Sequence, residues 1–380
     1  MPYTLSPNVG NLYIIRSWTQ DVMMVHTPSR FTDRSAMLLI TLSAVVVLIL
    51  LQLGRLGIDA SAAEVSNSAS NLNDQEFTPQ IQTAVRHGLL WLAQNQNADG
   101  SFSNNGSNAA ITALAGLAFV AGGNLPDQGP YSHQTDLALH YILNQCQQSG
   151  LIAAPGDGSP MYGHGFATLF LSEVYGESGD PDLRGDLEKA IRLIVQTQNS
   201  EGGWRYQPIP MDADLSVTIC QVMALRAARN AGVYVPIETI NKAISFVHRL
   251  QNADGGFSYM LEMPGSAFPR SAAGVALLQY AGVYDDPAIP RGLAYLRQCL
   301  PGTVANSQDN YYYGNYYGTQ AMFLAGGDNW STWWTAMSDD LLKRQQSDGS
   351  WNDSVGQSYG TAMALIILQI PNRFLPVLQR

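Results

Sequence analysis

Between residues 78 and 375 the chain alternates between two kinds of hydrophobic segment. In the first kind, of which 187–195 is an example, apolar residues recur every three or four positions and so share one face of a helix. In the second kind, exemplified by 109–120 and 360–368, nearly every residue is apolar. A helix without a polar face is buried on every side. The pattern therefore predicts outer helices that alternate with buried inner helices.

We expect six helices of each kind. The outer helices are predicted at 79–96, 134–147, 181–198, 237–251, 287–299 and 331–346, and the inner helices begin near 108, 162, 213, 270, 314 and 357. Six hairpins that bury an inner layer predict an all-α fold, an (α/α)6 toroid closed into a ring. An open solenoid is the alternative, but it would leave one face of the inner layer in contact with water.

A recurrent motif joins the two kinds of segment. It reads Gln, one or two small polar residues, an acid, Gly, Gly or Ser, and an aromatic, and its good copies are 96–102, 198–204, 251–257 and 346–351. Less complete copies end near Gly150 and Gly302. The motif glycines recur at 100, 150, 202, 255, 302 and 349, a period typical of repeat architectures. We expect each glycine to end the outer helix with a left-handed cap.

This repeat resembles the "QW" repeats of squalene cyclases, in the superfamily of terpenoid cyclases and protein prenyltransferases. The resemblance covers about residues 78–375. It implies a toroid whose ligand cavity opens near the N-terminal ends of the inner helices. Such ends present unpaired N–H groups and partial positive charge, so this mouth should favour anions or carboxylates. The fold is much better supported by the repeat than the reaction is.

The N-terminal part differs from the repeats. We expect a flexible segment at 1–35, a membrane anchor or signal-peptide core at 36–53, and a linker at 54–77 before the toroid domain at 78–380. The apolar run is just short of a spanning helix, for which roughly 17–25 residues are usual. Arg30 and Arg34 precede it, which favours an N-terminus inside and a body outside the cytoplasm. The predicted location is therefore membrane-anchored and extracytoplasmic, or exported.

The overall composition excludes some partners. The formal charge of −10 argues against a nucleic-acid partner, which would require a basic surface. Charged residues make up 13%, about half the usual share, which suits a large buried layer. The zinc ligands of prenyltransferases have no match, because Gly360 stands at the expected His and no Asp-x-Cys precedes it. We expect no metal and no cofactor.

Three residues are candidates for acid–base chemistry. Asp212-Ala-Asp214-Leu-Ser stands where squalene–hopene-type cyclases carry Asp-x-Asp-Asp-Thr, and the resemblance makes Asp214 the acid that protonates an alkene. Leu215 replaces the third aspartate, so the charges that support this acid are incomplete. An Asp at a helix start is also an N-cap worth about 1 kcal/mol, which is the favoured interpretation. His164, between two glycines, is either a proton relay or a structural histidine.

Aromatic and basic residues near the same mouth are candidates for ligand binding. Aromatic faces can stabilise a carbocation, stack on a ligand, or close the mouth of the barrel. Neighbours four apart share a helical face, so the five tyrosines between 311 and 317 cannot all line one cavity. Structural or generic-binding use is favoured for this cluster. The candidate binding residues are Tyr162, Trp204, Arg270, Tyr312, Tyr316 and Tyr359.

Three functions remain open at this point. The protein binds or cyclises an isoprenoid or other lipid, or it is a binding or scaffold toroid without chemistry, or it acts on glycans through paired carboxylates. A deep apolar cavity would favour the first, a filled barrel the second, and an open polar groove with two acids the third.

Overall fold

The computed structural model describes residues 76–102, 108–306 and 310–379, all of them in one compact unit, 68–380. The predicted flexible segment and anchor, and the linker up to residue 75, lie outside the described residues. None of the described helices is long and apolar enough to cross a membrane. The described elements are the outer helices α2 (Pro79–Asn95), α4 (Ser132–Asn144), α6 (Pro181–Thr197), α8 (Ile237–Leu250), α10 (Ala288–Leu296) and α12 (Gly327–Arg344), the inner helices α3 (Asn108–Ala121), α5 (Pro160–Ser178), α7 (Leu215–Asn230), α9 (Phe268–Tyr280), α11 (Tyr311–Ala325) and α13 (Gln357–Gln369), and two 3-10 turns, η1 (Ile370–Asn372) and η2 (Pro376–Leu378).

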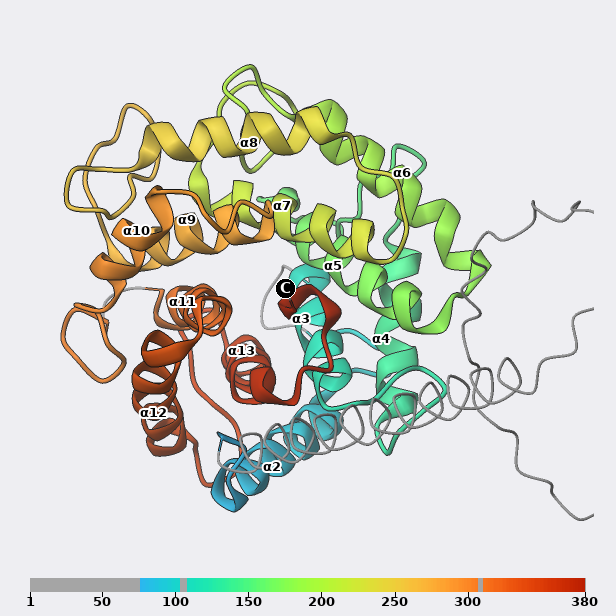
Figure 1. The fold of residues 1–380 in the computed structure, drawn as a ribbon. Helices are drawn as coiled ribbons and strands as arrows, with labels where there is room; N and C mark the ends of the chain where they lie inside the picture. The colour runs from blue at the N-terminus through green and yellow to red at the C-terminus, as the bar shows by residue number, and fades with distance from the viewer. Residues whose placement is uncertain (1–75, 103–107, 307–309, 380) are drawn as a thin grey trace, which may run out of the picture. The chain divides into compact units, whose positions relative to one another are not determined.

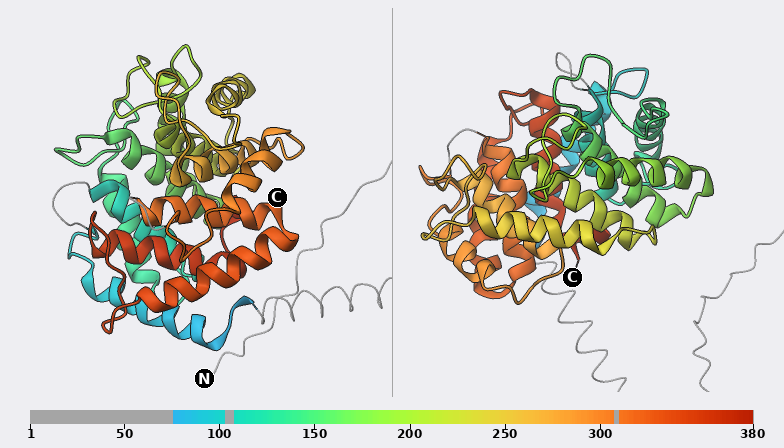
Figure 2. Two further views of the ribbon diagram at one scale, coloured as in Figure 1. Left: turned by 90° about the vertical axis from the view of Figure 1, so that its left-hand side faces the viewer. Right: turned by 90° about the horizontal axis from the view of Figure 1, so that it is seen from above.

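The inner helices form a closed ring. Each packs against the next in chain order, and α13 packs back against α3, so the ring has no open edge. Figure 1 shows the six inner helices around the centre, with the outer helices outside them. Figure 2 shows from two other sides that successive helices lie side by side. The predicted alternation of helix types is confirmed, because the described part of the chain is helical and its inner helices are almost wholly buried.

In each repeat the motif glutamine links neighbouring helix pairs. In each good copy its side-chain amide donates both to the motif glycine carbonyl and to a backbone carbonyl in the next outer helix, from Gln96, Gln198, Gln251 and Gln345 to Gln134, Thr239, Ala288 and Ala84. The last of these bonds joins the sixth pair to α2 and so closes the outer layer. The last copy thus begins at Gln345, and the register predicted at Gln346 was wrong by one residue.

The motif glycines do not cap the helices, which corrects the expectation from sequence. The outer helices end four or five residues earlier, where the glutamine adopts an extended conformation. The glycines lie within the following turn with positive φ, +100° at Gly202. A Cβ at Gly202 would lie 2.2 Å from the carbonyl oxygen of Lys242 in α8. Glycine is therefore required both by its φ and by the close approach of the next helix.

The motif aromatic fastens the turn to both helices of its pair. The indole of Trp204 donates to the carbonyl of Ile194 in α6, while its backbone N–H donates to the hydroxyl of Thr218 in α7. Trp351 repeats both bonds in the last pair, with Leu341 and Thr361. Each motif thus fixes where an inner helix begins relative to its outer helix. In this way it positions the residues at the mouth.

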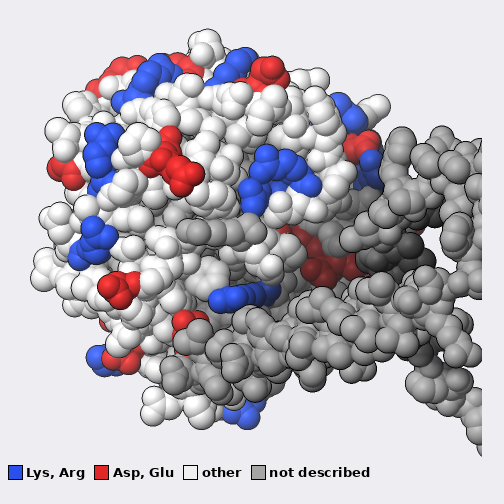
Figure 3. All heavy atoms as spheres, in the orientation of Figure 1, with Lys and Arg blue, Asp and Glu red and all other residues white. Residues whose placement is uncertain are grey.

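The chain's C-terminal segment packs at the other end of the inner helices. After α13 the chain turns through η1 and η2, and η2 packs against α7 with Val377 and Leu378 buried. Figure 1 places the C-terminus over the centre of the ring. Glu173 of α5 is buried near this segment, and burial raises the pKa of its carboxyl to about 8 against the opposing effect of the Val377 N–H. On the face seen in Figure 3, Lys and Arg are interspersed with Asp and Glu, and neither sign dominates.

Candidate functional site

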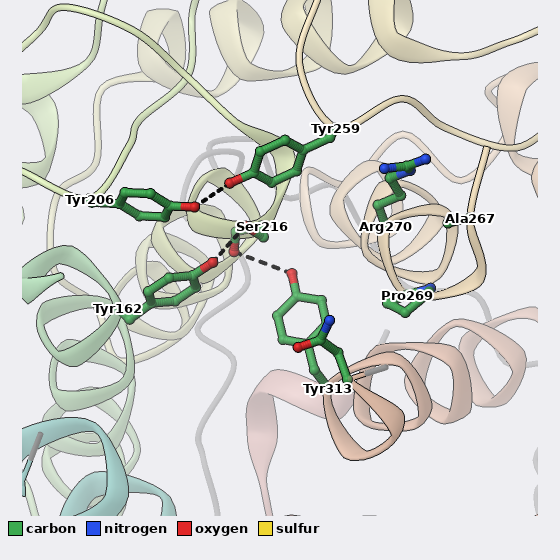
Figure 4. A pocket seen from close by; sticks show the side chains of 9 residues that line it. Tyr162, Tyr206, Ser216, Tyr259, Ala267, Pro269, Arg270 and Tyr313 are labelled. Carbon is green, nitrogen blue, oxygen red and sulfur yellow. Dashed lines mark hydrogen bonds between the residues drawn. The ribbon is translucent and has the colours of Figure 1, made fainter. Parts of the chain in front are cut away.

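A tyrosine-lined pocket lies at the N-terminal ends of four inner helices. Its volume is about 440 Å³, and it is lined by Tyr162, Tyr206, Ser216, Tyr259, Ala267, Pro269, Arg270, Asn310 and Tyr313. Figure 4 shows the four tyrosine hydroxyls turned toward the region around Ser216, with Arg270, Ala267 and Pro269 on the opposite wall. We call this the mouth pocket. Small-molecule sites commonly have volumes of about 300–1,000 Å³, so it is large enough for a ligand.

The repeat explains why these residues meet. Tyr162, Ser216, Arg270 and Tyr313 occupy the first turns of α5, α7, α9 and α11. Tyr206 and Tyr259 each follow a motif aromatic by two residues. Both therefore lie on the segment that leads from a motif turn to the mouth. Equivalent positions in successive repeats therefore supply both the floor and the rim.

A chain of hydrogen bonds leads from the pocket to a buried carboxyl. The hydroxyl of Tyr162 lies 2.6 Å from Ser216 Oγ, which donates at 2.6 Å to Asp214 Oδ1. The same oxygen accepts the N–H of Val217 at 2.9 Å, so Asp214 is the N-cap of α7. Asp214 is wholly buried and is not part of the pocket lining. Ser216 therefore separates the Asp214 carboxyl from a ligand in the pocket.

The second oxygen of Asp214 has no hydrogen-bond partner. Arg205 Nε lies 3.7 Å from it, but the guanidinium of Arg205 is already hydrogen-bonded to Asp212. Burial is the largest influence and raises the pKa of Asp214, opposed by the bonds from Ser216 and Val217, by Tyr259 and by the charge of Arg205. A carboxyl in this position is more readily protonated than one in water.

Tyr206 and Tyr259 form a pair of hydroxyls on the rim, bonded to each other. Tyr313 donates to the backbone carbonyl of Ser216 at 3.3 Å. Burial raises the pKa of Tyr162, Tyr259 and Tyr313, so these hydroxyls stay neutral and serve as hydrogen-bond donors and acceptors. Arg270 is the charged residue of the lining, and its Nε has no hydrogen-bond partner.

Two of the residues expected from sequence to bind a ligand lie in the mouth pocket, namely Tyr162 and Arg270. Asp214 lies one hydroxyl behind it. Asp212 is half exposed and pairs with Arg205, so it neither caps α7 nor bonds to Asp214. Whether any of these residues acts in catalysis or binding stays a prediction.

His164 and Trp204 lie in the wall of the fold instead of the pocket. Both nitrogens of His164 are bonded, Nδ1 to the N–H of Ile152 and Nε2 to the carbonyl of Ala190, each at 3.2 Å. The imidazole thus performs in the second pair the task that Thr218 performs in the third. Burial lowers the pKa of His164 to about 4, so the ring is neutral. This geometry fits the structural alternative left open for His164 and offers no path for a proton relay.

The remaining predicted aromatics do not line the mouth pocket either. Tyr316 is buried and meets Phe166 edge to face, with ring centroids 6.3 Å apart. Tyr312 packs edge to face on Tyr311, and Tyr359 is a partly buried residue of α13 that packs against the core. Because only Tyr313 of the tyrosine cluster lines the pocket, the expectation that the five tyrosines cannot share a cavity is confirmed.

Sequence reasoning did not select Ser216, Tyr259 or Tyr313 as ligand-binding residues, and it gave Tyr206 no role of its own. A usable signal was present: Tyr206 and Tyr259 stand at the same offset from two motif aromatics. Such a coincidence suggests a shared rim, but nothing local indicates that four inner helices bring these residues to one place.

No group of three or more His, Cys, Asp or Glu among the described residues could hold a metal ion. The described cysteines Cys146, Cys220 and Cys299 are free thiols.

Comparison with known proteins supports the fold. No protein-family model matches the chain. The chain is 24% identical over 214 residues to drimenyl diphosphate synthase of Streptomyces showdoensis, a match covering 55% of this chain and 36% of the relative's length. The type II terpene cyclase MstE from Scytonema, solved with its substrate geranylgeranyl dihydroxybenzoate, aligns with a TM-score of 0.54 and 14% identity, over 78% of this chain and 98% of its own.

A glycoside hydrolase has a similar backbone. The GH76 α-mannanase of Bacteroides thetaiotaomicron aligns with a TM-score of 0.56 and 10% identity, over 78% of this chain and 97% of its own.

The predicted resemblance to the terpenoid cyclase superfamily is confirmed, and the fold is that of an α-helical toroid shared by these enzymes. Structural likeness at such low identity shows the fold and leaves the reaction open.

Proposed function

We propose that this terpenoid-cyclase-like toroid binds an isoprenoid or related apolar ligand in the mouth pocket and does not enclose it in the bore of the ring. The observation that carries the proposal is a pocket lined by four tyrosines with no carboxylate, above a bore in which side chains of α5, α7 and α11 contact one another. A ligand of this type is bound by a structural neighbour, MstE, whose substrate is geranylgeranyl dihydroxybenzoate.

Aromatic side chains from opposite sides of the ring meet in the bore. Tyr316 of α11 contacts Phe166 of α5, and its hydroxyl reaches the sulfur of Met223 in α7. Tyr317, also from α11, bonds to Cys220 of α7. A long polyprene folded within the ring would have to displace these side chains. The mouth pocket needs no such displacement, since its tyrosine faces offer apolar area and their hydroxyls mark where a polar end would lie.

Acid-catalysed cyclisation is the second candidate, and one observation favours it. Asp214 has a raised pKa and is connected through Ser216 to Tyr162 at the pocket. A proton held there could in principle reach a ligand. Against this, Asp214 Oδ1 is committed to capping α7, and Leu215 occupies the position of the family's third aspartate.

The glycan-hydrolysing alternative has the weakest support. Glycoside hydrolysis requires two carboxyl groups on either side of the bond to be cut, about 5–10 Å apart. The lining of the mouth pocket contains neither Asp nor Glu. The similarity to a mannanase therefore extends to the helical scaffold and not to a pair of acids at this pocket.

The proposal is tested by titrating the detergent-solubilised full chain with farnesol and following heat or tyrosine fluorescence. Ala267→Trp places a large side chain in the pocket wall and should abolish binding. Ala253→Trp, at an exposed position of a repeat turn, is the matched control and should bind as well as the unchanged chain. Binding that survives Ala267→Trp would remove the mouth pocket as the site.

The same samples separate binding from chemistry. Incubation with squalene and shorter linear isoprenoids should give no cyclic product if the toroid only binds. A cyclic product that disappears in Asp214→Asn would establish the second candidate in place of the first.

The extracytoplasmic location remains part of this proposal and rests on the apolar run 36–53 with its preceding arginines. Membrane fractionation and external protease treatment of spheroplasts test it. A body protected from protease would contradict it.

A further inference from the structure

We infer that the ligand of the mouth pocket carries a carboxylate or phosphate, and that Asp214 takes up a proton when this anion enters. The inference rests on the proposed function, because it assigns a charge to the ligand of the same pocket. It adds a pH dependence that the shape of the pocket does not imply.

The lining favours an anion. Arg270 supplies a positive charge to the lining, and the lining contains no acid that would neutralise it. The three inner helices α5, α9 and α11 begin at the pocket without a side-chain cap and without an acid in their first turns. The partial positive charges of these helix ends add to that of Arg270, whereas the N–H groups of Met161 and Tyr162 in α5 already donate to the carbonyls of Tyr206 and Ser159.

Asp214 opposes the same anion when it is ionised. Its carboxylate lies behind Ser216, one residue from the pocket, and it is wholly buried, so water screens its charge poorly. Two like charges near one buried site raise each other's preference for the protonated state. The oxygen that would accept the proton is Oδ2, because it has no hydrogen-bond partner whereas Oδ1 already accepts two.

Arg205 Nε lies 3.7 Å from Asp214 Oδ2 and offsets part of this repulsion, but the guanidinium of Arg205 also pairs with Asp212. The titratable or charged groups that interact with Asp214 are Tyr162 of α5, Cys220 of α7, Arg205 and Asp212 of the loop before α7, Tyr259 of the loop before α9, and Tyr313 of α11. Burial raises the pKa of the three tyrosines and brings that of the Cys220 thiol to about 12, so these groups are neutral in the physiological range. Arg205 keeps its charge and shares it with Asp212.

The binding step is balanced as one anion and one proton entering together. The ligand keeps its own bonds and charge, the Asp214 carboxylate becomes a carboxylic acid, and the proton comes from solvent. By linkage, the apparent affinity should fall up to about tenfold for each pH unit between the pKa of Asp214 in the empty pocket and its higher pKa in the complex. Below that pKa the carboxyl is already protonated and the affinity should be constant.

The experiment is calorimetric titration of the full chain with farnesoic acid from pH 6 to 9, where the carboxylate of the ligand stays ionised. Each titration is repeated in buffers of different ionisation enthalpy, which gives the number of protons taken up. We expect proton uptake at pH values between the pKa of Asp214 in the empty pocket and its higher pKa in the complex, and a falling affinity over the same range. Asp214→Asn retains an N-cap residue and should bind with a flat pH profile and no proton uptake.

Two further probes separate the sources of the effect. Farnesol has the same chain without the charge and should bind without proton uptake, while acetate and inorganic phosphate test whether the anion alone suffices. Arg270→Gln should weaken farnesoic acid at least tenfold and change farnesol little. Zero proton uptake at every pH, or an unchanged pH slope in Asp214→Asn, overturns the inference. Failure of both farnesol and farnesoic acid to bind would instead overturn the proposed function.

Discussion

Replacing motif glycines with alanine separates two reasons for glycine at one repeated position. Gly202 and Gly302 occupy the same place in their repeats, and both have positive φ, +100° and +81°. A Cβ at Gly202 would lie 2.2 Å from the Lys242 carbonyl oxygen, whereas a Cβ at Gly302 would meet nothing within 4 Å. Gly302→Ala therefore isolates the backbone strain, and Gly202→Ala adds a clash with α8.

The strain of a left-handed residue with a Cβ is on the order of 1–2 kcal/mol. Overpacking against a backbone that must move adds roughly 1–3 kcal/mol. We therefore expect Gly302→Ala to lower the free energy of unfolding by about 1 kcal/mol and Gly202→Ala by about 2–5 kcal/mol. Gly255→Ala should resemble Gly202→Ala, because its Cβ would lie 2.4 Å from the Arg291 carbonyl oxygen.

Urea denaturation of the three variants, followed by far-UV circular dichroism, measures these differences. Equal destabilisation at Gly202 and Gly302 would show that α8 does not approach the turn as closely as described. Unchanged stability in all three would refute the left-handed conformation of the motif glycine itself.

Three other predictions concern stability. The lowered pKa of His164, about 4 against an ordinary 6.5, favours the neutral ring in the folded state, so stability present above pH 6.5 should be lost as pH falls toward 4, by about 3 kcal/mol. Denaturation midpoints across this range test it, and His164→Gln should flatten the profile. The raised pKa of Glu173, about 8 against an ordinary 4.5, works in the opposite sense: stability present below pH 4.5 should be lost as pH rises to about 8, and a Glu173→Gln variant with the same loss would contradict this. Gln345→Leu leaves the carbonyls of Ala84 and Gly349 without their donor and should cost about 1–3 kcal/mol in thermal unfolding, whereas a comparable loss in the exposed neighbour Gln346→Leu would show that ring closure is not the cause.

Much of the fold could be predicted from the sequence because the signal repeats. Helix type follows from the periodicity of apolar residues, and this pattern recurs in every helix pair. The expected helices agree with the observed ones to within a few residues. The positions of the motif glycines could be predicted from the sequence, but the residues that pack against these glycines could not. Their role depends on the distance to the next outer helix, which is a property of the assembled ring.

The candidate site was predicted less completely for a similar reason. Tyr162 and Arg270 could be selected because both stand at the start of an inner helix. Trp204 and His164 turn into the wall instead, where Trp204 bonds to the Ile194 carbonyl of its own pair and His164 bonds to the N–H of Ile152 and to the Ala190 carbonyl of the next pair. Which way a side chain turns at a helix start depends on contacts between pairs, and these are not visible in one repeat.

A ligand is proposed to occupy the mouth pocket and not the bore or the outer surface. Photoaffinity labelling with a farnesol analogue that carries a diazirine, followed by peptide mass spectrometry, tests this most directly. We expect fragment-ion spectra of the labelled peptides to place the labels on Tyr162, Tyr206, Tyr259 and Tyr313, competed by farnesol and absent in Ala267→Trp. Labels confined to Phe166, Met223 or Tyr316 in the bore, or spread over the outer helices without competition, would contradict the claim.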